Sequence, residues 1–382
     1  MLYVNGTIYD GSGAPPIYPG ALLTQDDRIL YAGPMAGLPA TDQEPIDLQG
    51  GIIVPGYIDI HHHGGAGGAY DDGLEAAKEA VKVHRQHGTT RCVISLVTAS
   101  MPTLIARMSA LRPLVDEDPL VLGLHAEGPF LHPSKKGAHD PELLTAPLDE
   151  HLEKLLDAHG DALVQITIAP ELENGIKAVA TLTSHKVKVA VGHTDADYEK
   201  ANEAFTHGAT ILTHTFNAMN GIGHRAPGPV IAALRTPTVW LEIINDGIHV
   251  HPSVVKTLFL EAPERTVLVT DSMSATCSPD GHYQIGNLDV TVDKGIATLT
   301  HGGSLAGSTL TMDKAVANAV TKVGVPLELA VAAATSHPAK AIGKGDLYGL
   351  LKEGYPADYL LLDQDTLLPH TVYANGQEIK TD

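Results

Sequence analysis

The sequence predicts an α/β protein: a (β/α)8 barrel of the TIM type, with a small β-sandwich domain formed by both chain termini. Apolar, β-rich runs alternate with helix-like stretches through the middle of the chain, which is typical of repeated βα units and a parallel sheet. Eight such strand candidates can be counted, the number in a TIM-type barrel. Residues 370–376 also echo residues 3–6, which indicates that the two ends of the chain build one sheet.

The first 53 residues contain short strand candidates separated by turns. These candidates are residues 2–4, 7–9, 21–24, 28–32 and 51–54, with Asn5-Gly6 as a hairpin-type turn. Residues 357–363 and 370–376 are also strand-like. We therefore expect a discontinuous β domain of residues 1–53 and 355–382, and a barrel domain of residues 54–354.

The barrel strands and helices follow from the alternation of the two patterns. Because active sites of TIM-type barrels lie at the carboxyl ends of the strands, the residues that follow each strand are candidates for a site. After the eighth strand we expect an inserted hairpin in residues 283–299 and helices at 311–322 and 327–335. The predicted strands are 52–60, 90–96, 120–125, 163–169, 187–191, 210–214, 239–245 and 267–270, and the predicted helices include 74–86, 101–111, 147–159, 175–184, 196–206 and 252–259.

Composition excludes several classes of protein. The formal net charge of −20 argues against a broad nucleic-acid surface and against an anionic membrane surface. Cys92 and Cys277 lie far apart in unrelated patterns, so neither a disulfide framework nor a cysteine zinc site is predicted. The chain begins without a signal-type segment, and no apolar run reaches about 18 residues. We expect a cytoplasmic protein that does not span a membrane.

Three consecutive histidines follow the first predicted barrel strand. Side chains alternate along a strand, so His61 and His63 should point the same way and His62 the opposite way. Neutral imidazole is a common metal ligand, and two imidazoles fixed side by side would suit a divalent cation. The alternative interpretation is a hydrated loop. The other strand ends decide between the two.

Five more strands end in ligand-type residues. Each could separately be a helix cap or a polar loop residue, but together at one end of a barrel they predict a metal site. Nitrogen and oxygen ligands in this mixture suit zinc, iron, manganese or cobalt. One cation could use a subset, or two could share Glu127 as a bridge. The candidate ligands are His61, His63, Glu127, His193, His214 and Asp271.

The chemistry expected of such a site is hydrolysis. A bound divalent cation lowers the pKa of water towards about 7 and polarises a carbonyl group. Asp271 is the candidate general base and acid, because a carboxylate beside the attacking water can take its proton and return it to a leaving group. The alternative for Asp271 is an N-cap of a following helix.

Several motifs resemble the amidohydrolase superfamily and, within it, the N-acetylglucosamine-6-phosphate deacetylase family. The resemblance runs over nearly the whole chain. Its more specific parts are His-Ala-Glu-Gly-Pro-Phe at 125–130 and Thr-His-Thr-Phe-Asn-Ala-Met at 213–219. It also includes Pro-Gly-Tyr-Ile-Asp-Ile-His-His-His-Gly at 55–64, Lys-Lys-Gly-Ala-His at 135–139, Gly-His-Thr at 192–194, Asp-Gly-Ile-His at 246–249, Thr-Asp-Ser at 270–272 and Leu-Ala-Gly-Ser-Thr-Leu at 305–310.

The resemblance implies a metal-dependent deacetylase that converts N-acetyl-D-glucosamine 6-phosphate to D-glucosamine 6-phosphate and acetate. It implies that Glu127, His193 and His214 hold the catalytic cation, and that His61 and His63 complete a second position. Asp271 would activate water. The cofactor would be one or two divalent cations per subunit, zinc before iron, manganese or cobalt.

The resemblance also implies a set of substrate-binding residues. In relatives the phosphate-binding arginine can come from the neighbouring subunit, which implies a homodimer. The segment around Arg225 reads Gly-His-Arg-Ala-Pro-Gly, whereas relatives usually have a run of the Gly-Arg-Glu-Pro-Gly type. The implied substrate-binding residues are His139, Asn217, Ala218, Arg225 and His249.

Other functions stay open at this point. The same site could act on another N-acetyl amino sugar such as N-acetylgalactosamine 6-phosphate, on an N-acyl-D-amino acid or on a cyclic amide. A non-enzymatic alternative is a sugar-phosphate-binding or regulatory protein on a barrel scaffold. Histidines in or beside predicted helices are expected to be solvated; they include His84, His87, His151, His159, His185 and His207.

Overall fold

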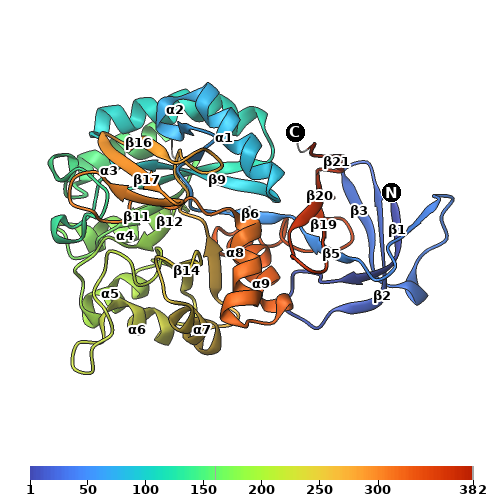
Figure 1. Ribbon diagram of the computed structural model, residues 1–382. Helices are drawn as coiled ribbons and strands as arrows, with labels where there is room; N and C mark the ends of the chain where they lie inside the picture. The colour runs from blue at the N-terminus through green and yellow to red at the C-terminus, as the bar shows by residue number, and fades with distance from the viewer. Residues whose placement is uncertain (160, 381–382) are drawn as a thin grey trace.

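A parallel eight-stranded barrel forms the centre of the molecule. The computed structural model describes residues 1–159 and 161–380. All eight predicted barrel strands are present, and each pairs in parallel with its sequence neighbour (Figure 1). The strands are β6 (Tyr57–Asp59), β9 (Thr89–Val97), β10 (Val121–Glu127), β11 (Leu163–Ile168), β12 (Lys188–Val191), β13 (Ile211–Leu212), β14 (Trp240–Ile244) and β15 (Thr266–Val269).

The first and last strands approach each other through residues that flank the site. The Asp271 N–H donates to the carbonyl oxygen of His61 at 2.9 Å. The Thr270 hydroxyl donates to the Asp59 carboxylate at 2.5 Å, and this contact is fully buried. These bonds hold the ends of β6 and β15 together and fix His61 against Asp271.

Amphipathic helices cover the outside of the barrel. In α1, Ala77, Ala80, Val81 and His84 form the buried face, at the spacing of one helical stripe. Two helices have the predicted bounds, whereas α2 continues six residues further than predicted. The helices are α1 (Leu74–Gln86), α2 (Met101–Glu117), α3 (Asp149–His159), α4 (Gly175–Ser184), α5 (Tyr198–Thr206), α6 (Gly228–Arg235), α7 (Pro252–Glu261), α8 (Met312–Asn318), α9 (Leu327–Ala334) and α10 (Ser336–Ala341).

Both termini contribute to a second sheet, at the right of Figure 1. Strand β5 joins the two ends of the chain in this sheet: it pairs in parallel with β1 and antiparallel with β19. The echo between the two ends of the sequence predicted such a shared sheet. Ile8, Leu22, Ile29 and Tyr359 are fully buried in its core. The strands are β1 (Leu2–Ile8), β2 (Ile17–Gln25), β3 (Arg28–Pro34), β4 (Pro45–Asp47), β5 (Ile52–Pro55), β19 (Tyr359–Leu362), β20 (Pro369–Ala374) and β21 (Gln377–Glu378).

Two local predictions about the strands of the terminal sheet were wrong. The run 52–60 is not one strand: β5 belongs to the terminal sheet, β6 belongs to the barrel, and Gly56 separates them. Asn5-Gly6 is not a hairpin turn. It lies inside β1, where Asn5 takes a left-handed φ of 55° and the register with β2 shifts, which is the geometry of a bulge.

An inserted sheet follows the eighth barrel strand. A hairpin was expected there, but three antiparallel strands are present, because the chain turns again after β17. Val290 and Met273 pack in the small core beneath them. The strands are β16 (Gly281–Ile285), β17 (Leu288–Asp293) and β18 (Ile296–Leu299); the remaining short elements are β7 (Gly64–Gly65), β8 (Gly68–Ala69), 3-10 turns at Met35–Gly37, Tyr70–Asp72, Pro133–Lys135 and Pro141–Leu143, and a π-helical turn at Ala319–Val323.

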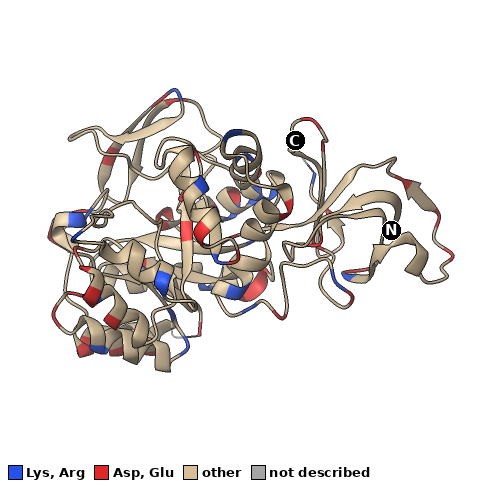
Figure 2. Cartoon of the chain, turned by 90° about the horizontal axis from the view of Figure 1, so that it is seen from below, with Lys and Arg blue, Asp and Glu red and all other residues tan. Residues whose placement is uncertain are grey.

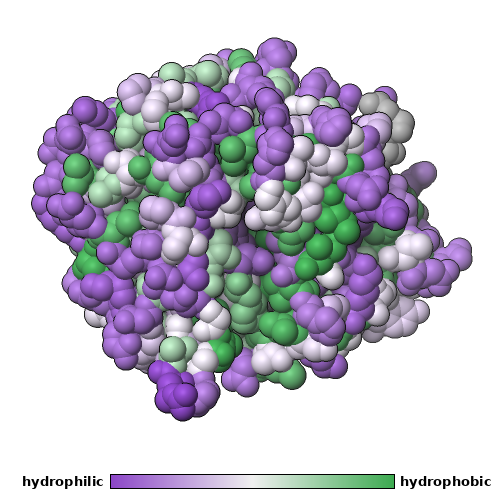
Figure 3. Space-filling model, turned by 60° about the vertical axis from the view of Figure 1, so that its left-hand side comes forward, coloured by the Kyte–Doolittle hydropathy of each residue, from purple (hydrophilic) through white to green (hydrophobic). Residues whose placement is uncertain are grey.

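The surface is mostly polar and acidic. In Figure 2 the Lys and Arg positions are interleaved with Asp and Glu, of which the sequence has 25 and 45 respectively. Figure 3 shows one face, on which hydrophilic side chains surround separate apolar patches. Within residues 1–159 and 161–380, no helix has the combination of length and apolar character needed to cross a membrane.

Candidate functional site

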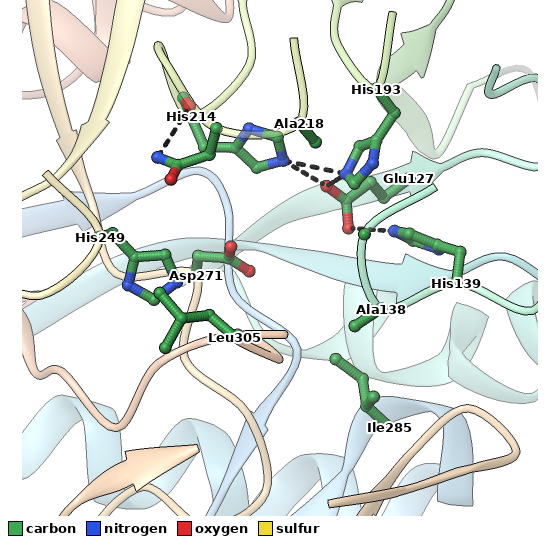
Figure 4. A pocket seen from close by; sticks show the side chains of 13 residues that line it. Glu127, Ala138, His139, His193, His214, Ala218, His249, Asp271, Ile285 and Leu305 are labelled. Carbon is green, nitrogen blue, oxygen red and sulfur yellow. Dashed lines mark hydrogen bonds and ion pairs between the residues drawn. The ribbon is translucent and has the colours of Figure 1, made fainter. Parts of the chain in front are cut away.

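One pocket at the carboxyl ends of the barrel strands gathers most of the predicted site residues (Figure 4). It encloses about 160 Å³. Leu305 and Ile285, from segments that follow the eighth strand, form an apolar wall on one side. The lining residues are Glu127, Gly137, Ala138, His139, His193, His214, Asn217, Ala218, His249, Asp271, Ile285, Leu305 and Gly307.

Glu127, at the end of β10, is the centre of the polar cluster. Its Oε1 lies 3.2 Å from Nε2 of both His193 and His214. Its Oε2 lies 3.1 Å from Nε2 of His63 and 3.4 Å from Nε2 of His139. The residue is only 4% exposed. One buried carboxylate is therefore faced by imidazoles on both of its oxygens.

The imidazoles of the cluster are oriented by partners on their far sides. His193 Nδ1 lies 2.8 Å from the Lys135 carbonyl oxygen, and His61 Nδ1 lies 3.1 Å from Glu242 Oε2. Since a carbonyl or carboxylate oxygen can only accept, Nδ1 of each ring donates, and a neutral ring has its lone pair on Nε2. In both rings Nε2 is directed towards Glu127, at 3.3 Å for His61 and 3.2 Å for His193.

The Nε2 atoms of these rings come close to one another. His193 Nε2 lies 3.0 Å from His214 Nε2, and His61 Nε2 lies 3.2 Å from His63 Nε2. Two imidazole nitrogens at this distance repel each other unless a single proton or a cation lies between them. The donor set of imidazole nitrogens around a carboxylate therefore fits a divalent cation of the zinc type.

Two overlapping groups have the geometry of a cation site. In one, ligand atoms of His61, His63 and Glu127 lie within 4.8 Å of one another; in the other, those of Glu127, His139 and His193 do. His139 was expected only as a substrate-binding residue, yet its ring lies beside Glu127. Glu127 is common to both groups, which is the position expected of a bridging carboxylate.

Asp271 follows β15 and faces the histidine pair. Its Oδ1 lies 3.4 Å from His63 Nε2 and 3.8 Å from His61 Nε2. Burial raises the pKa of Asp271, but the hydrogen bond from His63 and the charge of His61 outweigh burial and lower the pKa to about 2. Asp271 is therefore a carboxylate at neutral pH. The N-cap alternative was wrong, because the next helix in the described chain, α8, begins at Met312.

Backbone conformation aims three of these side chains into the pocket. His193, His214 and Asp271 have left-handed φ angles of 47°, 26° and 48°. Such angles are uncommon for residues other than glycine and persist where the surroundings fix them. At Asp271, the carbonyl oxygen accepts from Ser308 N–H at 2.7 Å while its own N–H is bound to His61. The site is thus held by the backbone as well as by side chains.

Four of the five predicted substrate-binding residues line the pocket: His139, Asn217, Ala218 and His249. His249 Nδ1 donates to Asp246 Oδ2 at 2.6 Å. Burial lowers the pKa of His249, but the contact with Asp246 outweighs burial and raises it. His249 therefore presents a positively polarised ring to the pocket.

Arg225 is not brought to the pocket of its own chain. It is exposed in the loop between β13 and α6, which extends outward at the lower left of Figure 1. Among the described residues it has no hydrogen-bond or ion-pair partner, and it does not line the pocket. Its predicted role therefore requires a substrate-binding site in another copy of the chain.

Sequence reasoning missed the residues that support the cluster from behind. Glu242 is fully buried in β14, where it accepts from His61, from the His214 N–H at 3.3 Å and from Gln165 Nε2 at 2.9 Å. A single carboxylate inside the apolar run Val-Trp-Leu-Glu-Ile-Ile was the available signal. Burying a charge is costly unless it is paired, so such a residue indicates a nearby partner.

The prediction that the helix-associated histidines are solvated was wrong for several of them. His84 and His159 are buried, each with Nε2 close to a backbone carbonyl oxygen, that of Gly64 at 2.8 Å for His84. His87 is partly buried between Cys277 and Asp313. His84 belongs to the buried face of α1, His159 contacts Ile105 of the neighbouring helix α2, and His87 follows the last residue of α1. Position relative to neighbouring elements therefore sets burial more strongly than residue type does.

Known proteins resemble this chain over most of its length. The sequence model of the amidohydrolase family matches residues 52–381. An N-acetylgalactosamine-6-phosphate deacetylase of Escherichia coli O157:H7 is 36% identical over 330 residues, covering 85% of this chain and 87% of that protein. An N-acetylglucosamine-6-phosphate deacetylase of Danio rerio is 34% identical over 348 residues, covering 87% and 86%.

A solved structure resembles the whole molecule. A mutant N-acetyl-D-glucosamine-6-phosphate deacetylase of Mycobacterium smegmatis, in complex with N-acetyl-D-glucosamine 6-phosphate, superimposes with a TM-score of 0.94. The two chains are 37% identical, and the match covers 100% of this chain and 99% of the other. The fold and the arrangement of the terminal sheet are therefore shared with an enzyme whose bound sugar phosphate is known.

Proposed function

This chain belongs to the amidohydrolase family, and on that premise we propose that it removes the acetyl group from N-acetyl-D-glucosamine 6-phosphate, giving D-glucosamine 6-phosphate and acetate. The observation that carries the proposal is the buried Glu127 carboxylate, faced by imidazoles on both oxygens and placed beside a free carboxylate, Asp271. A sugar-phosphate-binding or regulatory protein has no need for that combination.

The proposed cofactor is one or two divalent cations per subunit, zinc before iron, manganese or cobalt. Glu127, His193 and His214 would hold one, with His139 beside them, and His61 and His63 would complete a second position with Glu127. When bound, a cation of this kind activates water and polarises the amide carbonyl group.

The remaining steps fall to residues of the chain itself. The Asp271 carboxylate takes a proton from the attacking water as the water oxygen bonds to the acetamide carbon. The same carboxyl group then returns the proton to the amide nitrogen while the carbon–nitrogen bond breaks. Its lowered pKa keeps Asp271 ready to accept in the resting enzyme. The products leave as acetate and a free amine.

The pocket residues would orient the sugar phosphate. His249, held by Asp246, lies on the opposite side of the pocket from His139 in Figure 4. We propose that His249 meets the phosphate end, where its positive polarisation favours an anion, together with Asn217 and the backbone at Ala218. His139 would lie near the acetamide group.

We further propose that Arg225 completes the phosphate site of a second subunit in a homodimer. Its planar guanidinium group suits paired hydrogen bonds to phosphate oxygens. The support is that Arg225 is exposed on an extended loop and lies outside the pocket of its own chain.

Two other assignments also stay proposals. We place residues 1–53 and 355–382 in a discontinuous β domain and residues 54–354 in the catalytic barrel, in line with the division of the two large sheets. A cytoplasmic location suits an acidic chain with one buried and one exposed free cysteine.

The sugar epimer has a second candidate. The relative from Escherichia coli O157:H7, whose name gives N-acetylgalactosamine 6-phosphate as its substrate, is about as similar as those named for the glucosamine epimer. The full-length match to the Mycobacterium smegmatis complex favours the glucosamine epimer.

A substrate panel tests the proposed function. Acetate release should be measured from N-acetylglucosamine 6-phosphate, from its galactosamine epimer and from both unphosphorylated sugars. We expect the highest kcat/KM for N-acetylglucosamine 6-phosphate. A higher value for the galactosamine epimer would reverse the assignment of the epimer, and equal values with and without phosphate would remove the phosphate from the proposal.

A further inference from the structure

A second group of reactive side chains lies outside the pocket. It consists of Cys277 on the loop after β15, His87 at the C-terminus of α1 and Asp313 in the first turn of α8. Cys277 Sγ lies 3.3 Å from His87 Nε2, and His87 Nδ1 lies 2.9 Å from Asp313 Oδ2. None of the three takes part in the proposed deacetylation.

These contacts place a thiol, a base and an orienting carboxylate side by side, in the order Cys277, His87, Asp313. Asp313 is only 4% exposed, and its carboxylate accepts from His87 Nδ1, so Nε2 is the ring atom turned to the thiol. The hydrogen bond to Asp313 and then that to Cys277 raise the pKa of His87 to about 10, against the effect of burial. Such a ring readily holds a proton taken from the thiol, and a thiolate is the nucleophilic form of cysteine.

The position of the thiol is fixed by its loop. The Thr276 N–H donates to the Met273 carbonyl oxygen at 2.9 Å, and the Ser278 N–H donates to that of Ala275 at 3.0 Å. The Thr276 carbonyl oxygen accepts from the Ala66 N–H at 2.9 Å. Hydrogen bonds thus flank Cys277 on both sides and keep its side chain against His87.

The two cysteines of the chain differ in access and in surroundings. Cys277 is exposed, whereas Cys92 is buried in the barrel, where burial raises its pKa to about 12. Of the titratable groups around His87, Asp313 from α8 and Cys277 from the loop face it directly, and His84 lies one turn earlier on α1. The folded chain therefore offers one accessible thiol with a base beside it.

We propose that Cys277 is a modification site that undergoes thiol–disulfide exchange with small disulfides, with His87 as the proton acceptor and Asp313 as its positioning residue. The proton of the thiol moves to His87 Nε2, and the thiolate attacks one sulfur of a disulfide R–S–S–R. The bond from Cys277 to that sulfur forms and the original S–S bond breaks. The second sulfur leaves as a thiolate, which takes up a proton from His87 or water, so that Cys277 is oxidised and the small disulfide is reduced.

The rate of reaction with oxidised glutathione or an aromatic disulfide tests this site. At pH 6.5 an ordinary thiol, with a pKa of about 8.5, is only about 1% ionised, so a base beside it should matter most there. We expect one mixed disulfide per folded chain, mapped to Cys277 by mass spectrometry and lost in Cys277→Ser. His87→Gln should slow the reaction by about tenfold or more at pH 6.5 and much less at pH 9. His185→Gln, which changes another helix-ending histidine, should leave the rate unchanged.

Asp313→Asn supplies a second variant that keeps the shape of the side chain. It should slow the reaction at pH 6.5 in the same direction as His87→Gln, because the protonated ring loses its carboxylate. Circular dichroism confirms that each variant is folded. Equal rates for wild type and both variants across the pH range would overturn the proposal, as would a folded protein whose Cys277 does not react. Neither result bears on the deacetylase reaction, which uses other residues.

Discussion

Glu127 and Asp271 are two buried carboxylates with different surroundings. Both oxygens of Glu127 face imidazole rings, and the charges and hydrogen bonds of those rings lower its pKa although burial alone raises it. Asp271 faces His63 through Oδ1, and its carboxylate is directed into the pocket in Figure 4. Glu127 is therefore suited to hold a cation, and Asp271 has a free oxygen with which to accept a proton.

Replacing Asp271 by asparagine should remove proton transfer with little change in pocket shape. We expect kcat for acetate release to fall by about 10²–10⁴-fold, the usual contribution of a positioned acid–base group. KM should change much less. Asp365→Asn, at an exposed position in the turn between β19 and β20, serves as the matched control. A variant at position 271 with wild-type kcat would remove Asp271 from the mechanism.

Glu242 should matter although it does not touch the pocket. Glu242→Gln takes away the carboxylate that accepts from His61 Nδ1 and leaves an amide of the same shape. Partners of this kind typically change metal affinity by about 10–100-fold. Titration of metal-free protein with zinc, followed by calorimetry, should show weaker binding than in wild type or in the surface control Glu199→Gln. Unchanged affinity would mean that Glu242 only fills space.

At this scale the sequence identified the histidines and carboxylates that gather around Glu127, but not the residues that support them from behind. Alternation along a strand was enough to separate His62, which contacts the Tyr70 hydroxyl through Nδ1 at 2.8 Å, from His61 and His63. The contact between Glu242 and His61 joins residues 181 positions apart. No local pattern encodes such a pair, because it depends on how the barrel closes.

At the scale of elements, Gly56 separates β5 of the terminal sheet from β6 of the barrel. The strand pattern runs unbroken from 52 to 60, but a Cβ atom at Gly56 would overlap the Thr90 side chain on the neighbouring barrel strand. Gly56→Ala should therefore lower the free energy of unfolding by about 1–3 kcal/mol, the usual cost of overpacking.

Urea unfolding of this variant measures the effect. Gly221→Ala is the matched control, because a Cβ atom there meets nothing within 4 Å and its backbone is not left-handed. If both variants unfold at the wild-type urea midpoint, the close approach of Gly56 to Thr90 does not determine where residues 52–60 divide into β5 and β6.

His337 in α10 gives the fold a pH dependence away from the site. It is buried, with Nδ1 donating to the Thr266 carbonyl oxygen at 2.8 Å, and burial lowers its pKa to about 4. The unfolded chain, with a pKa near 6.5, binds more protons between about pH 4 and pH 6.5, so stability falls as the pH is lowered through this window.

In His337→Asn no group titrates at this position. Between pH 7 and pH 4 the variant should therefore lose less stability than wild type, by up to about 3 kcal/mol for a shift of this size. Trp240, the one tryptophan of the chain, has its ring 5.7 Å from that of His337 and reports unfolding by fluorescence. If the free energy of unfolding changes equally with pH in the two proteins, His337 is not the titrating group.

The periodicity of apolar residues predicted the bounds of elements that bury one face. It predicted poorly those elements whose existence depends on tertiary contacts. The bounds of α1 and α4 follow from their apolar stripes. The third strand of the insertion, β18, and the short helix α6 depend on packing against segments distant in sequence. Asn5-Gly6 has the chemistry of a turn, but β1 continues through it because β2 and β5 pair on both sides.

At the scale of the whole molecule, the proposed homodimer places Arg225 of one subunit in the phosphate site of the other. Arg225→Ala should raise KM for the phosphorylated sugar by about 10–100-fold, the loss expected for a charge-assisted pair of hydrogen bonds. KM for the unphosphorylated sugar should not change. An equal effect on both sugars would contradict a role of Arg225 in phosphate binding.

Mixing two variants that are impaired at low substrate distinguishes an arginine of the partner subunit from the chain's own arginine. If Arg225 acts across the dimer, exchange of subunits between Arg225→Ala and Asp271→Asn proteins creates dimers with one intact site. Activity at low substrate should then recover to about a quarter of wild type, since half of the dimers are mixed and one of their two sites is complete. No recovery after confirmed subunit exchange would contradict a shared site.

The central claim is that the cluster around Glu127 holds a divalent cation that the deacetylation requires. Acetate release from N-acetylglucosamine 6-phosphate should be followed before chelation, after removal of metal and after addition of stoichiometric zinc, manganese, cobalt or iron. The account predicts that the rate is lost in metal-free, folded protein and restored by at least one of these cations. Full turnover by protein shown to be metal-free would contradict it.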